Sequence, residues 1–164
     1  MKLVVFSDSH GSSLFLHKAM ALHSDADAFA HLGDGLSEFI AESKQYRDKQ
    51  ILYVAGNCDY FLSKEKNPPR DLTAELDGFT FFFTHGHHYG VKESPERLLW
   101  RAAELYADAA FYGHTHIARC EYLPNGFYLV CPGSISLPRQ SRASYAVAET
   151  YKGKLICRTA EIRA

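Results

Sequence analysis

The sequence predicts an α/β fold, because apolar segments of strand length alternate with helical patterns along its 164 residues. Five of these segments are rich in β-branched, aromatic or small apolar residues, as strands are. They are Leu3–Phe6, Ala28–Leu32, Ile51–Ala55, Phe79–Phe83 and Ala109–Tyr112. The C-terminal part differs, because three strand-like segments follow one another with Gly or Pro turns, which predicts antiparallel pairing. These segments are Phe127–Cys131, Ser144–Glu149 and Lys154–Thr159.

Helical patterns separate several of the strands. One helix is indicated by an i, i+3, i+4, i+7 spacing at Leu36, Phe39, Ile40 and Ser43. Another opens at Ser94-Pro95-Glu96, with Ser94 as the N-cap and proline in the first turn. Its predicted apolar face consists of Leu98, Leu99, Ala102, Leu105 and Tyr106.

Length and composition favour one globular domain over residues 1–164. Hydrophobic residues make up 46% and charged residues 23%, which is ordinary for a folded domain. The prolines and charges of Lys64–Arg70 predict a loop inside this domain rather than a linker. The four cysteines are far apart and form no CxxC, which disfavours a disulfide framework or a zinc knuckle.

Charge and hydropathy narrow the function classes. The net charge of −1 and the absence of a basic stripe argue against a long nucleic-acid footprint. No apolar run approaches the ~20 residues of a membrane span, and the N-terminus lacks the features of a signal peptide. We therefore expect a cytoplasmic protein without membrane contact.

Polar motifs follow each of the first five strand segments. They are Ser7-Asp8-Ser9-His10-Gly11, Gly33-Asp34-Gly35, Gly56-Asn57-Cys58-Asp59, Thr84-His85-Gly86-His87-His88 and Gly113-His114-Thr115-His116. Ligands of α/β sheets bind outside the carboxyl ends of the strands, so these loops are expected to converge on one site. Asp, His and Asn side chains suit Mn, Fe, Zn and similar divalent ions. The set is large enough for two ions, and Asp34 is the candidate to bridge them, an arrangement typical of phosphoester hydrolysis.

These five ordered motifs, from Asp8 to His116, resemble those of the calcineurin-like metallophosphoesterases. The short chain and the Gly-Asn-Cys-Asp variant are most similar to the small phosphodiesterases of the YfcE type, a branch that includes vacuolar sorting protein 29 of the retromer. The resemblance implies a metallo-dependent phosphatase fold, with two mixed β-sheets packed as a sandwich and flanked by helices (αββα).

The resemblance also implies roles for single residues. One ion would be held by Asp8, His10, Asp34 and His116, and the other by Asp34, Asn57, His85 and His114. A hydroxide bridging the ions would attack phosphorus, while Asn57 and the ions stabilise charge on the phosphoryl oxygens. The implied cofactor is a pair of divalent ions, with Mn²⁺ as the first choice and Fe, Zn, Ni or Mg as alternatives.

Cys58 departs from the family pattern, in which many members carry His at that position. That histidine, oriented by the next acid, is thought to protonate the leaving group or hold the substrate. A thiol is a weak hydrogen-bond donor, and Asp59 has no imidazole to orient. We therefore expect slow turnover of substrates with poor leaving groups. His87 and His88 are hypothetical replacement donors.

The leading function is a metal-dependent phosphodiesterase acting on a small substrate. The alternatives are a non-catalytic metal-binding scaffold for protein partners, and a phosphomonoesterase or cyclic-nucleotide phosphodiesterase. Arg139 and Arg142 are candidates for contact with an anionic substrate, although their positions fit a solvated loop equally well. Exposed apolar residues of the C-terminal strands leave a homo-oligomer open.

Overall fold

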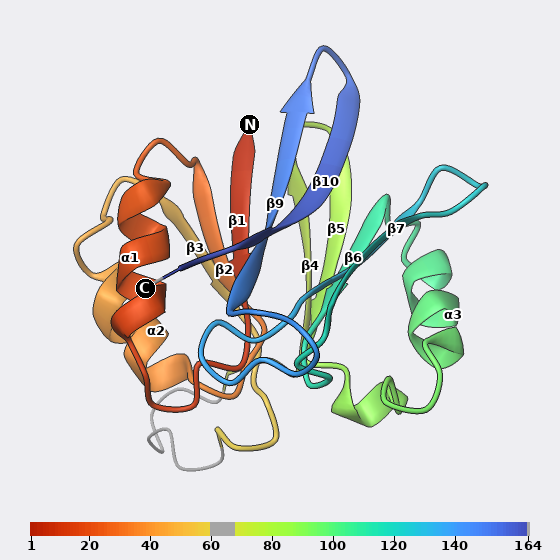
Figure 1. Ribbon diagram of the computed structural model, residues 1–164. Coiled ribbons are helices and arrows are strands. Elements are labelled where there is room, and N and C mark those ends of the chain that lie inside the picture. The colour runs from red at the N-terminus through yellow and green to blue at the C-terminus, as the bar shows by residue number, and fades with distance from the viewer. Residues whose placement is uncertain (60–67, 164) are drawn as a thin grey trace.

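Two five-stranded β-sheets face each other in the computed structural model, which describes residues 1–59 and 68–163 (Figure 1). The first sheet has the order β10-β9-β1-β2-β3 and the second has the order β4-β5-β6-β8-β7. The strands of the first sheet are β1 Lys2–Phe6, β2 Ala28–His31, β3 Gln50–Tyr53, β9 Ser144–Tyr151 and β10 Lys154–Glu161. Those of the second are β4 Asp71–Leu76, β5 Phe79–Thr84, β6 Ala109–Tyr112, β7 Ala118–Tyr122 and β8 Tyr128–Pro132.

Both sheets are mixed. Strands β1, β2 and β3 are parallel, and β9 and β10 continue the sheet antiparallel. In the second sheet β5, β6 and β8 are parallel, and β4 and β7 form antiparallel edges. The predicted antiparallel pairing is thus confirmed for β9 and β10, whereas β8 pairs antiparallel with β7 instead of with β9. The chain crosses from one sheet to the other after Pro132, so β8 and β9 do not pair.

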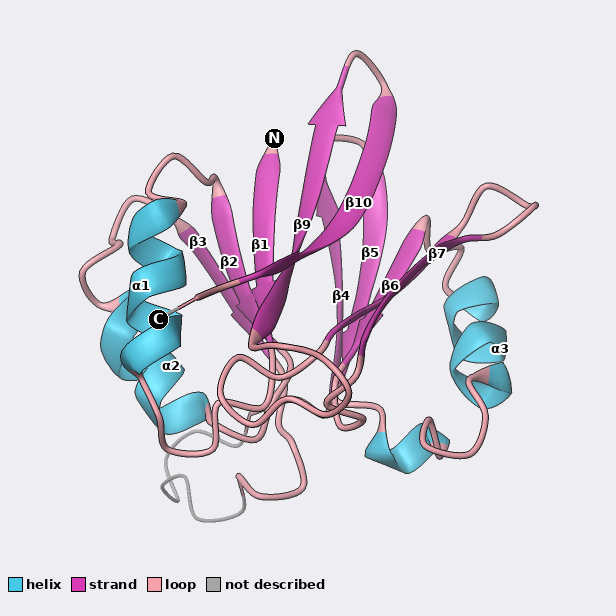
Figure 2. Ribbon diagram, viewed as in Figure 1, coloured by secondary structure: helices cyan, strands magenta, loops and turns pink. Residues whose placement is uncertain are grey.

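Helices cover the outer face of each sheet in the part of the chain that the structure describes (Figure 2). Helices α1 (Leu14–Leu22) and α2 (Leu36–Ser43) bury Leu16, Met20 and Phe39 against the first sheet. Helix α3 (Glu96–Glu104) buries Leu98 and Ala102 against the second, and a short 3-10 helix, η1, spans His87–Tyr89. This arrangement confirms the αββα sandwich.

A third apolar layer lies between the sheets. Phe81, Phe83 and Phe111 of the second sheet pack there against Leu3 and Val5 of the first. The rings of Phe83 and Phe111 are stacked, with centroids 5.5 Å apart and an interplanar angle of 18°. Burial of aromatic and aliphatic side chains on both faces of the central strands explains why those strands are nearly all apolar. It also fixes where each strand ends, and so where the polar loops begin.

Several sequence expectations need correction. The edge strands β4 and β7 were not predicted, and in both of them polar residues alternate with apolar or small ones along the sequence. Helix α3 begins at Glu96, with Pro95 rather than Ser94 in the cap position, although the Ser94 hydroxyl still accepts the N–H of Glu96. Tyr106 lies beyond that helix and is 89% exposed, so its place on the apolar face was wrong. The predicted loop Lys64–Arg70 lies largely outside the described residues.

The described helices are also short. None of them is long and apolar enough to cross a membrane.

Candidate metal centre

The loops after β1, β2, β3, β5 and β6 carry all the predicted site residues. They lie at the same edge of the two sheets, at the bottom of the view in Figure 1. Two groups of side chains there have ligand atoms within 4.8 Å of one another; the groups are Asp8, His10 and His116, and Asp34, His85 and His114. A third such group joins Cys58 to His10 and Asp34. The structure therefore brings together residues that are spread over more than a hundred positions.

Asp8 is fully buried at the centre of the first group. Its Oδ2 accepts hydrogen bonds from the Ser7 hydroxyl at 2.5 Å and from the His114 backbone N–H at 3.1 Å. Its Oδ1 is buried and has no hydrogen-bond donor among the described residues. Instead it lies 3.2 Å from Nε2 of His116 and 3.8 Å from Nε2 of His10. A buried carboxylate oxygen without a donor is costly, unless a cation or a proton reaches it.

The orientation of His116 makes that requirement stricter. Its Nδ1 lies 2.7 Å from the Leu137 carbonyl, which can only accept, so the ring N–H is at Nδ1. In its neutral form the ring therefore directs the lone pair of Nε2 at the Asp8 carboxylate, and only the protonated ring can donate a hydrogen bond to it. Nε2 of His10 lies 3.2 Å from the same atom. Acceptors that converge without a donor fit a bound cation.

The second group repeats this design. Nδ1 of His85 lies 2.7 Å from the Leu32 carbonyl, so the lone pair of the neutral ring is at Nε2. That atom lies 3.4 Å from Oδ2 of Asp34 and 3.1 Å from Oδ1 of Asn57. The ring of His114 lies next to it, with centroids 5.0 Å apart. Two carboxylate- and imidazole-rich clusters therefore lie side by side.

The backbone of the centre is strained. The residues Asp8, His10, Asp34, His114 and His116 all have φ between 45° and 68°, a left-handed conformation that non-glycine residues seldom adopt. Each costs about 1–3 kcal/mol and persists only where the surroundings enforce it. Neighbouring glycines allow this close packing: a Cβ on Gly33 would lie 2.2 Å from the Gly56 nitrogen. The strain is concentrated at the predicted ligands.

Asp59 holds the turn that carries Asp34. Its two carboxylate oxygens accept four backbone N–H groups, from Asp34, Gly35, Leu36 and Gly56, at 2.7–3.1 Å. The residue is 9% exposed. With two donors on each oxygen, Asp59 is committed to the backbone rather than to a substrate or to an imidazole at position 58. Its role is to position Asp34.

Three positioning groups were missed from the sequence. Ser134 and Ser136 donate to the backbone carbonyls of Asp8 and Ser9 at 2.6 and 2.7 Å. His31 is fully buried: its Nδ1 accepts the N–H of Gly33, and its Nε2 faces the Ser9 hydroxyl. Burial lowers the pKa of His31 to about 4, so the ring is neutral. Local sequence carries no signal for these long-range bonds.

Four histidines of this region divide into two with lowered pKa values and two with raised pKa values. Burial lowers the pKa of His114 and of His87 to about 4. Hydrogen bonding to Asp8 raises the pKa of His116, and the carboxylates of Asp34 and Asp8 outweigh burial to raise that of His85. These same contacts with histidines outweigh the effect of burial on the pKa of Asp8 and keep it below the usual range.

The remaining predicted residues lie around the centre. The ring of His87 is 5.2 Å from that of His85, and its Nδ1 is buried without a partner among the described residues. His88 is exposed and lies against His87, with ring centroids 3.8 Å apart and the rings tilted by 41°. Cys58 is an exposed residue, but partial burial of its thiol and the nearby Asp34 carboxylate raise the pKa of that thiol to about 11. The backbone of Arg139 contacts the centre, because its backbone N–H donates to the His116 carbonyl at 2.9 Å.

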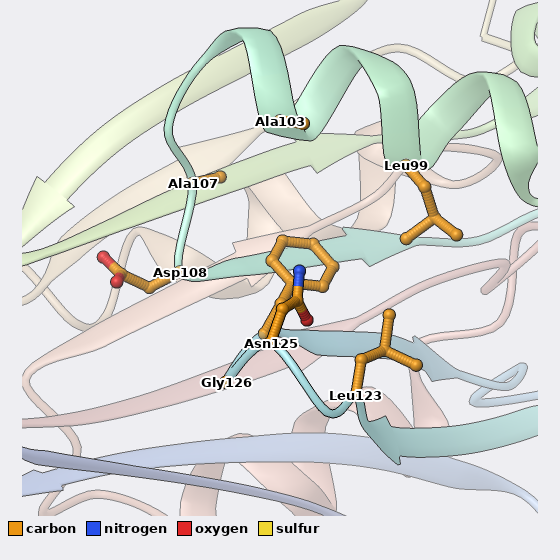
Figure 3. A pocket seen from close by; sticks show the side chains of 8 residues that line it. Leu99, Ala103, Ala107, Asp108, Leu123, Asn125 and Gly126 are labelled. Atoms are coloured by element: carbon orange, nitrogen blue, oxygen red, sulfur yellow. The ribbon is translucent and has the colours of Figure 1, made fainter.

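A small cavity of about 270 Å³ lies away from this centre (Figure 3). It is formed between α3 and the β7–β8 turn, with Leu99, Asp108 and Leu123 among its lining residues. Asp108 directly precedes β6, so this cavity is at the amino end of that strand. The polar loops lie at the opposite end, and we assign no ligand to this cavity.

Comparison with known proteins agrees with this geometry. The chain is 36% identical over 149 residues to the "probable metallophosphoesterase YsnB" of Bacillus subtilis, covering 90% of this chain and 83% of that protein. It is 30% identical over 128 residues to "phosphodiesterase MJ0936" of Methanocaldococcus jannaschii, covering 71% and 74%. The crystal structure of Chaetomium thermophilum Vps29 shares the fold, with a TM-score of 0.77 at 19% identity over 99% of this chain and 88% of that one. The family model of the calcineurin-like phosphoesterase superfamily domain matches residues 1–153, and the chain belongs to that superfamily.

Proposed function

We propose that this protein is a metal-dependent phosphodiesterase with a binuclear centre. The observation that carries the proposal is the pair of acceptor clusters, above all the buried Asp8 Oδ1 that faces the Nε2 lone pair of His116. Neighbouring acceptors of this kind are stabilised by a cation between them, and a bound metal ion supplies that charge where the imidazoles carry no extra proton. The relative of Methanocaldococcus jannaschii, named a phosphodiesterase, supports a diester substrate.

The proposed ligands are those that the structure brings together. One ion would be held by Asp8, His10, Asp34 and His116, and the other by Asp34, Asn57, His85 and His114. Mn²⁺ is the first choice, because oxygen and imidazole donors suit it, and Fe, Zn, Ni and Mg are the alternatives. When bound, two such ions supply an acidified water and positive charge for the phosphoryl oxygens.

The chain's own residues then orient the reaction. Asp34 links the two sets of ligands and is held in place by the Cys58 N–H, which donates to its Oδ1 at 2.6 Å. The Asn57 amide oxygen faces His85, and its NH₂ group, which donates one hydrogen to the Cys58 sulfur at 3.3 Å, has a second hydrogen to donate to a phosphoryl oxygen. His87 is a poor replacement proton donor, because burial lowers its pKa to about 4 and leaves that ring neutral near pH 7, so His88 stays as the candidate.

The test is hydrolysis of bis(p-nitrophenyl) phosphate by chelator-stripped protein, with and without Mn²⁺ and beside the monoester p-nitrophenyl phosphate. We expect turnover that the metal restores, that favours the diester, and that Asp34→Asn reduces by at least about a thousandfold. Preference for the monoester would instead indicate a phosphomonoesterase.

A second candidate is a metal-binding scaffold for protein partners. The observation in its favour is Cys58, whose thiol has a pKa of about 11 and donates protons poorly. If the protein binds metal but hydrolyses neither ester with Mn²⁺, Ni²⁺, Fe²⁺ or Zn²⁺, the scaffold would be the better assignment.

A further inference from the structure

A larger cavity of about 390 Å³ opens directly beside the candidate metal centre. It is lined by Val91, Lys92, Tyr112, Thr115, Ile117, Arg119 and Arg139. Thr115 lies between the proposed ligands His114 and His116, and the backbone N–H of Arg139 donates a hydrogen bond to the His116 carbonyl. The loop that carries two ligands is therefore also a wall of this cavity, whose volume is that of a small-molecule site.

The lining is cationic. It contains three basic side chains and no carboxylate. Arg119 is partly neutralised by an ion pair with Glu121 at 2.6 Å. Within residues 1–59 and 68–163, neither Lys92 nor Arg139 has a carboxylate at ion-pair distance. Two cations are thus left to face the solvent-filled cavity.

Both cations are exposed, and they come from distant parts of the chain to line one cavity. Lys92 follows η1 and Arg139 belongs to the loop between β8 and β9, yet both reach the same cavity. Arg142, only three residues after Arg139, lines a different cavity together with Phe15 and Ile162. Apolar walls complete the site, since Val91 is 7% exposed and Tyr112 is 3% exposed.

We propose that this cavity receives the part of the substrate beyond the scissile phosphate, and that Lys92 and Arg139 bind a second anionic group on it. The inference rests on the proposed phosphodiesterase function. The substrate class is then a phosphodiester in which one organic arm carries a further phosphate or carboxylate. Arg139, rather than Arg142, is the specificity-determining arginine of this loop.

The test compares substrates that share one scissile bond. They are the p-nitrophenyl ester of thymidine 5′-monophosphate, the same ester with a 3′-phosphate, and the same ester with a 3′-O-succinyl carboxylate. We expect kcat/KM to be roughly tenfold higher with the 3′-phosphate at low ionic strength, and the preference to shrink as salt screens the contact. An equal gain with the carboxylate would assign the site to oxyanions in general, and a gain with phosphate alone would assign it to phosphate.

Product inhibition makes the test independent of which arm enters the cavity. Thymidine 3′,5′-bisphosphate should inhibit roughly tenfold better than thymidine 5′-monophosphate. Both preferences should fall to about one in the Lys92→Gln/Arg139→Gln variant and persist in the matched control Arg142→Gln, with thermal unfolding midpoints reporting that each variant is folded.

The two proposals fail separately. Equal kcat/KM values for the charged and uncharged esters, with equal inhibition by the two nucleotides, would overturn the anion site while leaving the phosphodiesterase intact. Absence of metal-dependent hydrolysis of all these esters and of bis(p-nitrophenyl) phosphate would overturn the phosphodiesterase itself.

Discussion

The two sheets contribute chemically different halves of the candidate metal centre. Loops of the first sheet bring the proposed oxygen ligands Asp8, Asp34 and Asn57, whereas loops of the second bring the imidazoles of His85 and His114. His116 belongs to the second half and His10 to the first. The apolar core and these loops join the two sheets, and so do polar contacts such as the ion pair between the N-terminus and Asp77 at the opposite end.

The halves are also held in different ways. The oxygen half is fixed by many backbone hydrogen bonds, including the four that Asp59 accepts and those from Ser134 and Ser136. The rings of His85 and His116 are each oriented by one carbonyl. The geometry of the oxygen half therefore depends on backbone hydrogen bonds, whereas the metal affinity of the imidazole half depends on protonation of its rings. We expect mutation to affect the oxygen half most strongly and pH to affect the imidazole half.

The largest effect is expected for Asp59→Ala. Four N–H groups of a buried turn would lose their acceptor, and we expect the free energy of unfolding of the metal-free protein to fall by about 3–5 kcal/mol. Urea unfolding measures this. The control is Asp48→Ala, which removes an exposed carboxylate paired with Lys49 and should leave the free energy of unfolding nearly unchanged. A loss below about 1 kcal/mol at Asp59 would contradict the idea that this carboxylate holds the oxygen half.

A smaller effect is expected from pH on the imidazole half. The raised pKa values of His85 and His116 mean that these rings keep a proton to higher pH than usual, and a metal must displace it. Metal affinity should therefore rise with pH, by about tenfold per unit for each proton displaced, and level off above both pKa values. His114, with a pKa of about 4, adds no such dependence near neutrality.

Calorimetric titration of Mn²⁺ into stripped protein, in two buffers of different ionisation enthalpy, counts the protons released. The number should decrease from pH 6 to pH 8. The same affinity at both pH values would show that the two imidazoles are not ligands.

A contrast between central and edge strands explains which strands the sequence predicted. The central strands are buried on both faces, so runs such as Phe79–Phe83 were recognised, and the Asp and His residues that follow them were placed at one edge. The edge strands β4 and β7 were missed because their alternating polar residues have no continuous apolar run.

Long-range contacts were equally invisible. Asp59 follows Cys58 directly in the chain, which suggested a link to catalysis, but its partners are backbone groups 23–25 residues away as well as the nearby Gly56. The bonds from Ser134 and Ser136 span more than 120 residues. Such roles depend on backbone donors and carbonyls that every residue type carries, so residue identity alone does not reveal them.

The smallest effect, and the sharpest test of how the halves cooperate, is expected for Cys58→His. An imidazole there would restore a proton donor beside Asp34, and general acids typically contribute ~10²–10⁴-fold. The gain should be smaller, about tenfold, because both oxygens of Asp59 are already occupied by N–H donors and cannot orient the new ring.

The gain should also depend on the leaving group. A dialkyl phosphodiester needs its departing alkoxide protonated, whereas p-nitrophenolate leaves without help, so only the dialkyl ester should be hydrolysed faster by Cys58→His. Cys58→Ala is the matched control for loss of the thiol and should accelerate neither. Equal acceleration of both esters would mean that the new ring acts through the metal ligands, since proton donation alone cannot help a leaving group that does not require it.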